Sequence, residues 1–570
     1  MALFPPEFIV GLLAAFLQFR LRAYLSLASL LVNGLSFFLP PDDELIATLN
    51  GRGAGVPKSK ASTPLSPDDK MQAFYIKVAK TEHGVFQQTL FYELYEMLVI
   101  IVSSTLAACC VGDVLAFARP WFATDPAAAA DAALGYRPEV SVYGLVSALL
   151  VALWFPLQIK FAQGLATYEA RLGLGVGALG FVLAFFVLLA PKPLFDFDME
   201  RAADVIAARG AIALRAVGLA DSELEALAPL GAAARTALFA QMALLAGVFA
   251  STSFLPAFRF ARMYAEMTAE PGISRAKKAL LHVNMLAPLL VAALWIKPLA
   301  ADVFVPHYLV PCSPRALMRD CFATAADEAR FTSAPAFVLK ESQFATARVY
   351  VVLASVLVRL VCFRSHLQFF LLEIRDAVVQ LVRRTGAVDG ALLQSKVRVQ
   401  FNYLPIIAVQ YLAPVASVLA SALLLARQTG TSLGVLDGAL VVLTRVFGVA
   451  PPPPLGAALS PRNILPDATP PDFGAWRLGD ELQADKFTQF VKGMAQFTLV
   501  TPECHASLFG FFLWWLSFTW FAVSVAGLVY WKNVPHYAEV DESAALLAKR
   551  NKQTPKLLKN QLKGLKLKKQ

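Results

Sequence analysis

Long blocks of apolar residues divide the sequence and constrain its fold more than any other feature. Nine blocks of about 17–27 residues are long enough for an α-helix to cross the hydrocarbon core of a bilayer. They cover residues 4–20, 91–117, 141–160, 172–190, 236–257, 279–297, 345–363, 402–426 and 506–531. Backbone polar groups in lipid need internal partners, and these blocks are too long and too apolar for barrel strands. We therefore predict an all-α fold, a polytopic transmembrane helical bundle of about nine spans with amphipathic interfacial helices and no sizeable soluble domain.

The composition of the chain excludes most soluble classes of protein. Of its 570 residues, 57% are hydrophobic and only 16% are charged, whereas typical soluble domains are about 45–50% apolar and about 25% charged. A soluble chain of this length would form several domains, each covered by a charged surface. Because the charge available is too small for that, a soluble enzyme, a disordered scaffold and a disulfide-stapled secreted module are excluded.

Three apolar segments have more than one interpretation. Block 4–20 lacks a basic stretch before it, which favours a retained span with its N-terminus outside over a cleaved signal peptide. Segment 23–39 follows two arginines and is interpreted as lying on the membrane rather than crossing it. Residues 1–40 would then form an N-terminal span and an interfacial segment. Segment 432–448 contains Asp437 and Arg445 and is interpreted as an interfacial or lumenal helix.

The positions of the basic residues predict the orientation of the spans. With the N-terminus outside, the inner loops and the C-terminal tail carry 31 of the 51 lysines and arginines, as the positive-inside rule expects. The predicted divisions after residue 40 are a cytosolic loop at 41–90, spans 2–7 with outer loops at 91–363, a cytosolic amphipathic helix at 364–401, the last two spans at 402–531 with a long outer loop at 427–505, and a basic cytosolic tail at 532–570. The net charge of +10 is therefore an orientation signal and no sign of nucleic-acid binding.

The predicted cytosolic segments are amphipathic or basic. Segment 366–385 alternates apolar and charged residues and is expected to lie along the membrane or to cap the bundle. The tail is basic enough to be attracted to anionic lipid, although a solvated, disordered tail explains the same composition. Its last residues, 566–570, resemble a dibasic retrieval signal of endoplasmic-reticulum membrane proteins, so the endoplasmic reticulum and the plasma membrane both stay open as locations.

The sequence contains no pattern that predicts catalysis or a bound cofactor. The one G-x-S-x-G match, at 430–434, follows a transmembrane block, whereas a nucleophile elbow needs a strand before its serine. The six histidines form no zinc-binding pattern, and no phosphate-binding G-x-x-x-x-G-K-[ST] loop occurs. We expect no enzyme activity, no cofactor and no metal. Cys312 and Cys321 are predicted to share an outer loop, where an oxidising lumen would permit a disulfide between them.

Charged residues inside the spans are the strongest candidates for function, because a charge in lipid is costly unless it is paired or hydrated. Glu93 and Glu96 share a face of the second span, which also carries Asp113, and Arg348 and Arg359 share a face of the seventh. These residues are interpreted either as an intramembrane ion pair or ion path, or as side chains that reach water at the two ends of their helices. The second interpretation is favoured.

Uncharged polar residues, prolines and glycines add weaker signals. His282 with Asn284, and Gln410 with Tyr411, are expected to hydrogen-bond neighbouring helices. Prolines interrupt or end several spans and free carbonyls of the kind that transporters use to hold ions; they are Pro256, Pro288, Pro298, Pro405 and Pro414. Glycines give one face of the fourth span a smooth surface, which predicts close helix packing within the chain or between protomers; they are Gly173, Gly175, Gly177 and Gly180.

Several segments, in order along most of the chain, resemble the eukaryotic transmembrane protein 161 family. They are Leu30 to Phe37, Pro41 to Leu45, Leu255 to Arg262, Leu281 to Asp302, His366 to Gln368 and Val409 to Pro414, together with the Glu93/Glu96 start of the second span. The chain departs from the family in long insertions at 118–140 and 427–505 and in its basic tail. The resemblance implies a multipass membrane protein without known catalytic activity, in a family implicated in development and in modulating cation currents, with no active-site residues to transfer.

Two functional hypotheses follow. The first is a non-enzymatic regulator of membrane ion currents or signalling, which sits in the lipid bilayer and contacts partner membrane proteins such as ion channels through its helices. The second is an ion channel or secondary transporter in which the intramembrane Glu, Asp and Arg residues line the path.

Overall fold

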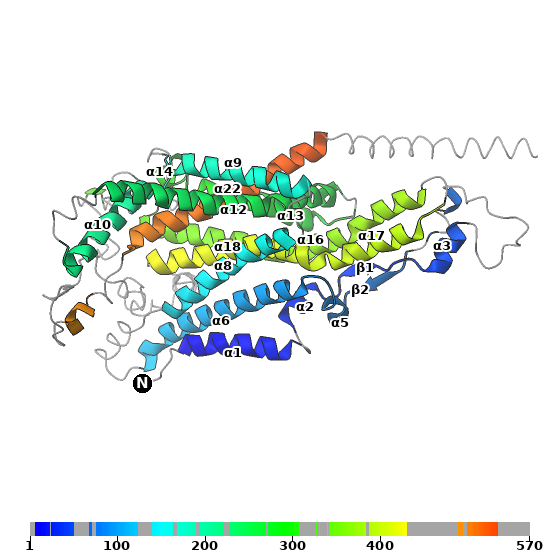
Figure 1. Ribbon diagram of the computed structural model, residues 1–570, viewed down its shortest axis with the longest axis horizontal. Helices are drawn as coiled ribbons and strands as arrows, with labels where there is room; N and C mark the ends of the chain where they lie inside the picture. The colour runs from blue at the N-terminus through cyan, green and yellow to red at the C-terminus, as the bar shows by residue number, and fades with distance from the viewer. Residues whose placement is uncertain are drawn as a thin grey trace, which may run out of the picture.

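The computed structural model is an elongated bundle of helices that run roughly along its longest axis (Figure 1). It describes residues 6–533 except 23, 25, 51–67, 71–73, 75, 123–138, 163–167, 190–193, 220–227, 270–271, 307–325, 328–329, 331–338, 340, 384–386, 430–486, 492 and 494–498. Within this part of the chain, eight helices are long and apolar enough to cross a membrane, and a shorter apolar helix covers Phe8–Leu21. The predicted all-α polytopic bundle is thereby confirmed, and the count agrees with about nine spans.

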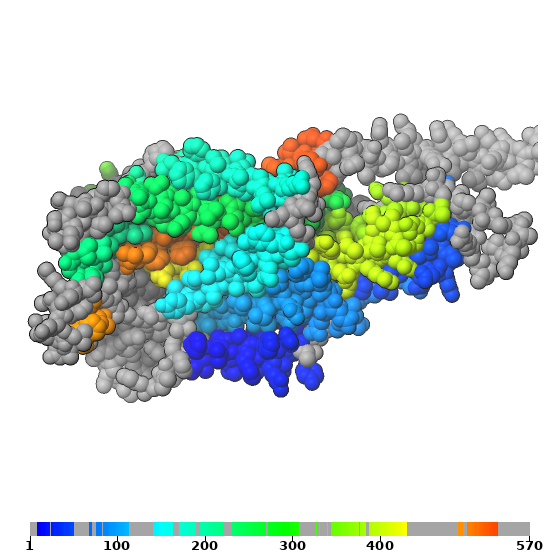
Figure 2. All heavy atoms as spheres, in the orientation of Figure 1, coloured from blue at the N-terminus to red at the C-terminus, as the bar shows by residue number. Residues whose placement is uncertain are grey.

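The bundle is built from nine main helices. They are α1 (Pro6–Leu21), α6 (Tyr92–Phe122), α8 (Glu139–Ala162), α9 (Tyr168–Leu188), α12 (Ala228–Ala269), α13 (Arg275–Ala293), α16 (Glu341–Arg383), α18 (Leu404–Thr429) and α22 (Pro502–Asn533). Helix α18 is the centre of the bundle, since nearly all of its residues are buried against α8, α16, α22 and α6. The outer helices expose apolar side chains, as lipid-facing helices do, and α1 and α9 form opposite edges of the face in Figure 2.

Helices α9 and α12 pack more closely than any ordinary side chains would allow. A Cβ added at Gly247 would lie 2.8 Å from the carbonyl oxygen of Gly177, and one added at Gly180 would lie 2.7 Å from the Cβ of Ala250. Small residues let two helix backbones approach in this way. The glycine face predicted for the fourth span therefore packs within the chain, except at Gly175, where an added Cβ would meet nothing within 4 Å.

The N-terminal segment folds back on the second span. Helix α1 runs antiparallel to α6, because Gly11 lies beside Ala108 while Gln18 accepts a hydrogen bond from Ser103. Segment 23–39 does not form a crossing helix: it contains the short helix α2 (Leu27–Val32) and the strand β1 (Ser36–Phe38), which pairs antiparallel with β2 (Val78–Lys80). The short helix α5 (His83–Phe86) then leads into α6.

A small unit of structure extends from one end of the bundle, which we call the α17 end. Helix α16 continues to Arg383 without a break, and α17 (Gly390–Asn402) returns along it. Between them Ile374, Val378 and Val382 are buried with Leu393 of α17 and with Leu49, the last residue of α3 (Asp43–Leu49). The apolar face of segment 366–385 is therefore covered by protein, and the division drawn at residue 364 falls inside one helix.

The opposite end, which we call the α10 end, contains a helix that the sequence patterns did not reveal. Helix α10 (Met199–Val217) begins at the N-cap Asp198 and ends at Gly218, whose φ of +113° is the left-handed conformation favoured at helix C-termini. Nearby, Phe195 forms an isolated bridge with Ile296 after α13, followed by the short helices η1 (Lys297–Leu299) and α14 (Ala301–Phe304). The predicted helix at 432–448 lies outside the described residues.

Candidate functional site

Four helices of the bundle bring a group of polar side chains together in the half nearer the α17 end. Asn284 comes from α13, Arg359 and His366 from α16, Tyr411 from α18 and Trp520 from α22; we call these five residues the Arg359 cluster. Each of the five is at most 6% exposed. Arg359 and His366 are seven residues apart on α16, about two turns, so they lie on the same face of that helix.

Hydrogen bonds connect one side of the cluster. The amide nitrogen of Asn284 lies 3.2 Å from Nε2 of His366 and 3.5 Å from the hydroxyl oxygen of Tyr411. The Tyr411 hydroxyl in turn donates to the backbone carbonyl oxygen of Arg359 at 3.0 Å. These contacts join α13, α16 and α18, as was expected of Asn284 and Tyr411, but the side chain of Arg359 takes no part in them.

The Arg359 guanidinium is buried without an acidic partner among the described residues. It stacks on the ring of Trp520, with its central carbon 4.1 Å from the ring centroid, while its Nε and Nη2 atoms have no hydrogen-bond partner. A desolvated cation–π contact contributes roughly 2 kcal/mol. The effective penalty for removing a cation from water is several kcal/mol even after the protein relaxes. Stacking on Trp520 therefore offsets only part of the cost of burying this charge.

Other buried donors of the cluster are also unpartnered. If the Asn284 amide nitrogen donates to Nε2 of His366, the ring hydrogen lies on Nδ1, and that atom has no partner. The indole nitrogen of Trp520 likewise has none, and the Asn284 carbonyl oxygen is the single unpartnered acceptor of the cluster. The cluster therefore presents more N–H donors than acceptors, in addition to the positive charge of Arg359.

The two glutamates predicted for the second span have separate environments. Glu96 is 4% exposed and accepts hydrogen bonds from Ser26 at 2.9 Å and from Tyr92 at 3.0 Å. Since Ser26 is the N-cap of α2, Glu96 attaches this short helix to α6. Glu93 is exposed, and of the third acid, Asp113, the structure describes only the backbone, within α6.

Arg348 forms an ion pair at the α10 end. Its guanidinium contacts the carboxylate of Asp196, an acid that the sequence patterns did not single out. The same guanidinium lies 4.2 Å from the ring centroid of Phe344 and 5.5 Å from that of Trp295. In the part of the chain that the structure describes, no ion pair or hydrogen bond joins either predicted arginine to Glu93 or Glu96.

The remaining predicted residues bond within the chain or fall outside the described part. His282 Nδ1 lies 2.7 Å from the Tyr264 hydroxyl, and Gln410 accepts a hydrogen bond from Arg259 at 3.0 Å. The predicted pair Cys312 and Cys321 lies outside the described residues, as does the basic tail. Among the residues that are described, no three His, Cys, Asp or Glu side chains meet as metal ligands would.

A small pocket lies between α8, α12 and α18. A proline in each of these helices removes one helical hydrogen bond near it. Proline cannot donate the helical hydrogen bond to the carbonyl four residues earlier, and Pro156, Pro256 and Pro414 each lie inside a helix. The carbonyls that lose this donor belong to Ala152, Thr252 and Gln410, all of which line the pocket. The other lining residues are Leu153, Pro156, Phe249, Ser253 and Pro414.

The chain was compared with known protein families and structures. No solved structure matches it. The family described as predicted transmembrane protein 161AB matches residues 142–326 and 314–534, which together are more than half of the chain. The chain belongs to this family. The matched region includes every member of the Arg359 cluster, and the resemblance found in the sequence is confirmed.

Two segments of the resemblance that are far apart in the sequence contact each other in the structure. The Gln368 side chain accepts a hydrogen bond from the backbone nitrogen of Ser36 and donates one to the backbone oxygen of Ser36, each at 2.9 Å. Arg364 donates to the carbonyl oxygen of Asn33 at 2.7 Å. These bonds attach the segment that leads into β1 to α16, so residues more than 300 positions apart form one contact in this member of the family.

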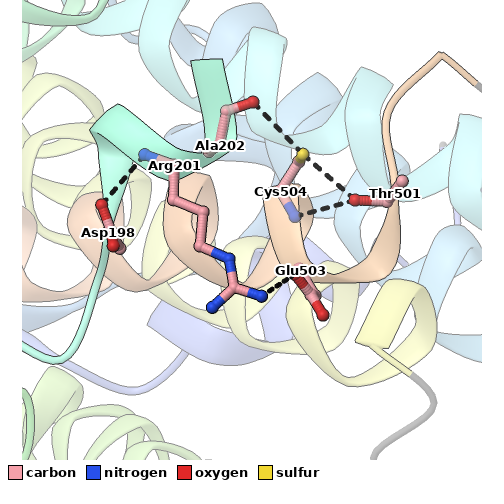
Figure 3. Close-up of polar contacts among 6 residues, drawn as sticks. All are labelled: Asp198, Arg201, Ala202, Thr501, Glu503 and Cys504. Atoms are coloured by element: carbon pink, nitrogen blue, oxygen red, sulfur yellow. Dashed lines mark hydrogen bonds and ion pairs between the residues drawn. The ribbon is translucent and has the colours of Figure 1, made fainter. Parts of the chain in front are cut away.

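The α10 end is held by a polar contact between the first turns of two helices (Figure 3). Arg201 of α10 forms an ion pair with Glu503 of α22 at 3.3 Å, and the Cys504 thiol lies 3.5 Å from the carbonyl oxygen of Ala202. Thr501 lies 3.1 Å from the same thiol. All of these groups contact one another within the chain, so the arrangement supports a structural role.

Sequence reasoning missed three of the residues that define these sites. Asp196 lies in a segment with no periodic pattern, and Trp520 was one of several aromatic residues in the last span. His366 was noted only in an amphipathic segment and in the family resemblance, with no role assigned to it. Its spacing of seven from Arg359 was the available signal, because residues seven apart share a helix face; the partner helices could not be read from the sequence.

Proposed function

We propose that this protein is a non-enzymatic regulator of membrane ion currents, acting through helix-mediated contacts with partner membrane proteins such as ion channels. One observation carries the proposal. The residues that could line an ion path are divided among separate intramolecular contacts: Glu96 with α2, Arg348 with Asp196, and Gln410 with Arg259. Side chains used in this way connect helices of one chain, which suits a bundle that acts through its outer surface.

A second candidate function, an ion channel or secondary transporter, is favoured by the pocket between α8, α12 and α18. Carbonyls freed by broken helices coordinate ions in transporters, and the three residues whose carbonyls lose their helical donor are among those that line this pocket. Against this function, the guanidinium of Arg259 lies at Gln410, and Lys160 donates to the backbone oxygen of Ser251 at 2.9 Å. Two cationic side chains close to the pocket oppose the entry of another cation.

Reconstitution separates the two candidates. The purified full chain in liposomes is expected to give cation and anion fluxes equal to those of protein-free liposomes. In cells that lack the protein, whole-cell cation current is expected to change and to return when the wild-type chain is expressed. A flux through liposomes that Gln410→Leu removes, and that the exposed control Arg375→Gln leaves intact, would establish the transporter instead. Unchanged cell currents would refute the regulator.

We also infer the orientation of the protein. The α17 end contains the segments 36–50 and 364–399, which contact each other through Asn50 and Val388 and were both assigned to the basic side. Their common location supports the predicted alternation of the spans, and the positive-inside rule then favours a cytosolic α17 end and a cytosolic tail. An endoplasmic-reticulum or plasma-membrane location and attraction of the tail to anionic lipid belong to the same proposal.

A further inference from the structure

We propose that the Arg359 cluster binds a small inorganic anion, of which chloride is the simplest, in the half of the bundle nearer the α17 end. The proposal does not depend on the regulator function. The first observation concerns which atoms of Arg359 lack a hydrogen-bond partner. Nε and Nη2 together form one edge of the guanidinium, and neither atom has a hydrogen-bond partner. This edge is the fork with which arginine binds anions through two parallel N–H groups.

The surroundings of the guanidinium leave that edge without a partner among the described residues. One face of the group is covered by Trp520, with 4.1 Å between the guanidinium carbon and the ring centroid. No described carboxylate forms an ion pair with Arg359, although two other buried or half-buried arginines have acids, Arg348 with Asp196 and Arg262 with Glu373. Arg359 differs from Arg348 and Arg262 in that its guanidinium meets an aromatic ring and no described acid.

The cluster has more N–H donors than acceptors, and this excess determines that the charge of the ligand is negative. The indole nitrogen of Trp520 is a buried N–H group without a partner, in addition to the two nitrogens of Arg359, and Nδ1 of His366 is another in the tautomer that accepts from Asn284 at Nε2. Buried polar groups in native proteins are nearly always hydrogen-bonded. A single acceptor with several lone pairs, such as a halide or an inorganic oxyanion, satisfies donors and charge together, whereas a cation would satisfy neither.

Burial limits the size of the ligand. Arg359 is 4% exposed, His366 is 1% exposed and Trp520 is 1% exposed. The site lies among α13, α16, α18 and α22, which leaves no described side of the cluster open to lipid acyl chains. A small ion suits this environment better than the phosphate of a membrane lipid, whose two chains would have to remain in the bilayer.

The first experiment measures thermal unfolding of the purified full chain in nanodiscs of neutral lipid, with sodium gluconate replaced by sodium chloride at constant ionic strength. We expect Tm to rise by about 1–2 °C at roughly ten to a hundred times the Kd, and to increase with the logarithm of the chloride concentration above the Kd. The rise is small because the Tm of a long chain shifts little for a given gain in free energy. The shift should disappear in Arg359→Gln. It should persist in the matched control Arg375→Gln, which changes an exposed arginine further along α16.

The second experiment needs no variant at the arginine. Iodide in place of chloride should quench part of the tryptophan fluorescence of the wild-type chain saturably at low concentration, and Trp520→Phe should remove that saturable component. Because Trp520 is buried, simple collisions from solvent would give only a linear and weak effect.

Three outcomes would overturn the proposal. The first is a Tm that does not respond to chloride, together with the absence of saturable quenching by iodide. The second is a shift of equal size in Arg359→Gln. The third is a shift produced only by anionic lipid in the nanodisc, which would assign the site to a lipid phosphate.

Discussion

The close approach of α9 and α12 leads to a sharp prediction for Gly247→Ala. The added methyl carbon would lie 2.8 Å from the Gly177 carbonyl oxygen and 3.1 Å from the Cβ of Phe181. Carbon–oxygen contacts between packed helices are normally about 3.3–3.6 Å, so the two helices would have to separate by roughly 0.5 Å. Overpacking of this kind typically costs about 1–3 kcal/mol. The obstructing atom is backbone, which cannot rotate away as the end of a side chain can.

The same helix offers a matched control. A Cβ added at Gly231 of α12 would meet nothing within 4 Å, so Gly231→Ala carries the gain in helix propensity, about 1 kcal/mol, without the clash. In a titration of the purified protein with SDS, we expect Gly247→Ala to be about 1–3 kcal/mol less stable than Gly231→Ala. A Gly247→Ala chain that unfolds at the same or higher SDS content than the control would refute the packing argument.

Three further predictions test other contacts. Gln368→Ala removes two hydrogen bonds to Ser36 and should lower stability by about 1–3 kcal/mol, with faster protease cleavage near β1; an unchanged cleavage rate would contradict the contact. Asp196→Asn leaves the guanidinium of Arg348 without its counter-ion and should cost about 1–3 kcal/mol, measured as a lower Tm that Arg348→Met in the same chain partly restores. A glycosylation sequon engineered within 40–85 should stay unmodified in cells, and modification there would reverse the inferred orientation.

The transmembrane character of this protein could be predicted from its sequence because lipid admits few solutions. A block such as 506–531 must be helical wherever it lies in a bilayer, since water is absent and each backbone group needs a partner within the segment. Those residues lie inside α22. The glycine face of the fourth span was equally visible, because side-chain size is a property of the sequence alone.

The roles of the polar residues could not be predicted in the same way. The charged residues of the second and seventh spans left an intramembrane ion pair open as one interpretation. In the structure the partners of Glu96 are Ser26 and Tyr92, and the partner of Arg348 is Asp196. Ser26 and Asp196 come from segments outside the predicted spans. Periodicity shows which face of a helix a residue occupies, but it does not show which segment packs against that face.

The sequence by itself determined the class of this protein, a polytopic helical bundle, and the packing face of one span, because hydrophobicity and residue size act locally. Only the tertiary structure decided which buried charges are neutralised. Arg348 meets an acid and Arg359 meets Trp520, although both are arginines on the same face of the same helix. The difference depends on which helices surround them, and that is fixed by the packing of the whole chain.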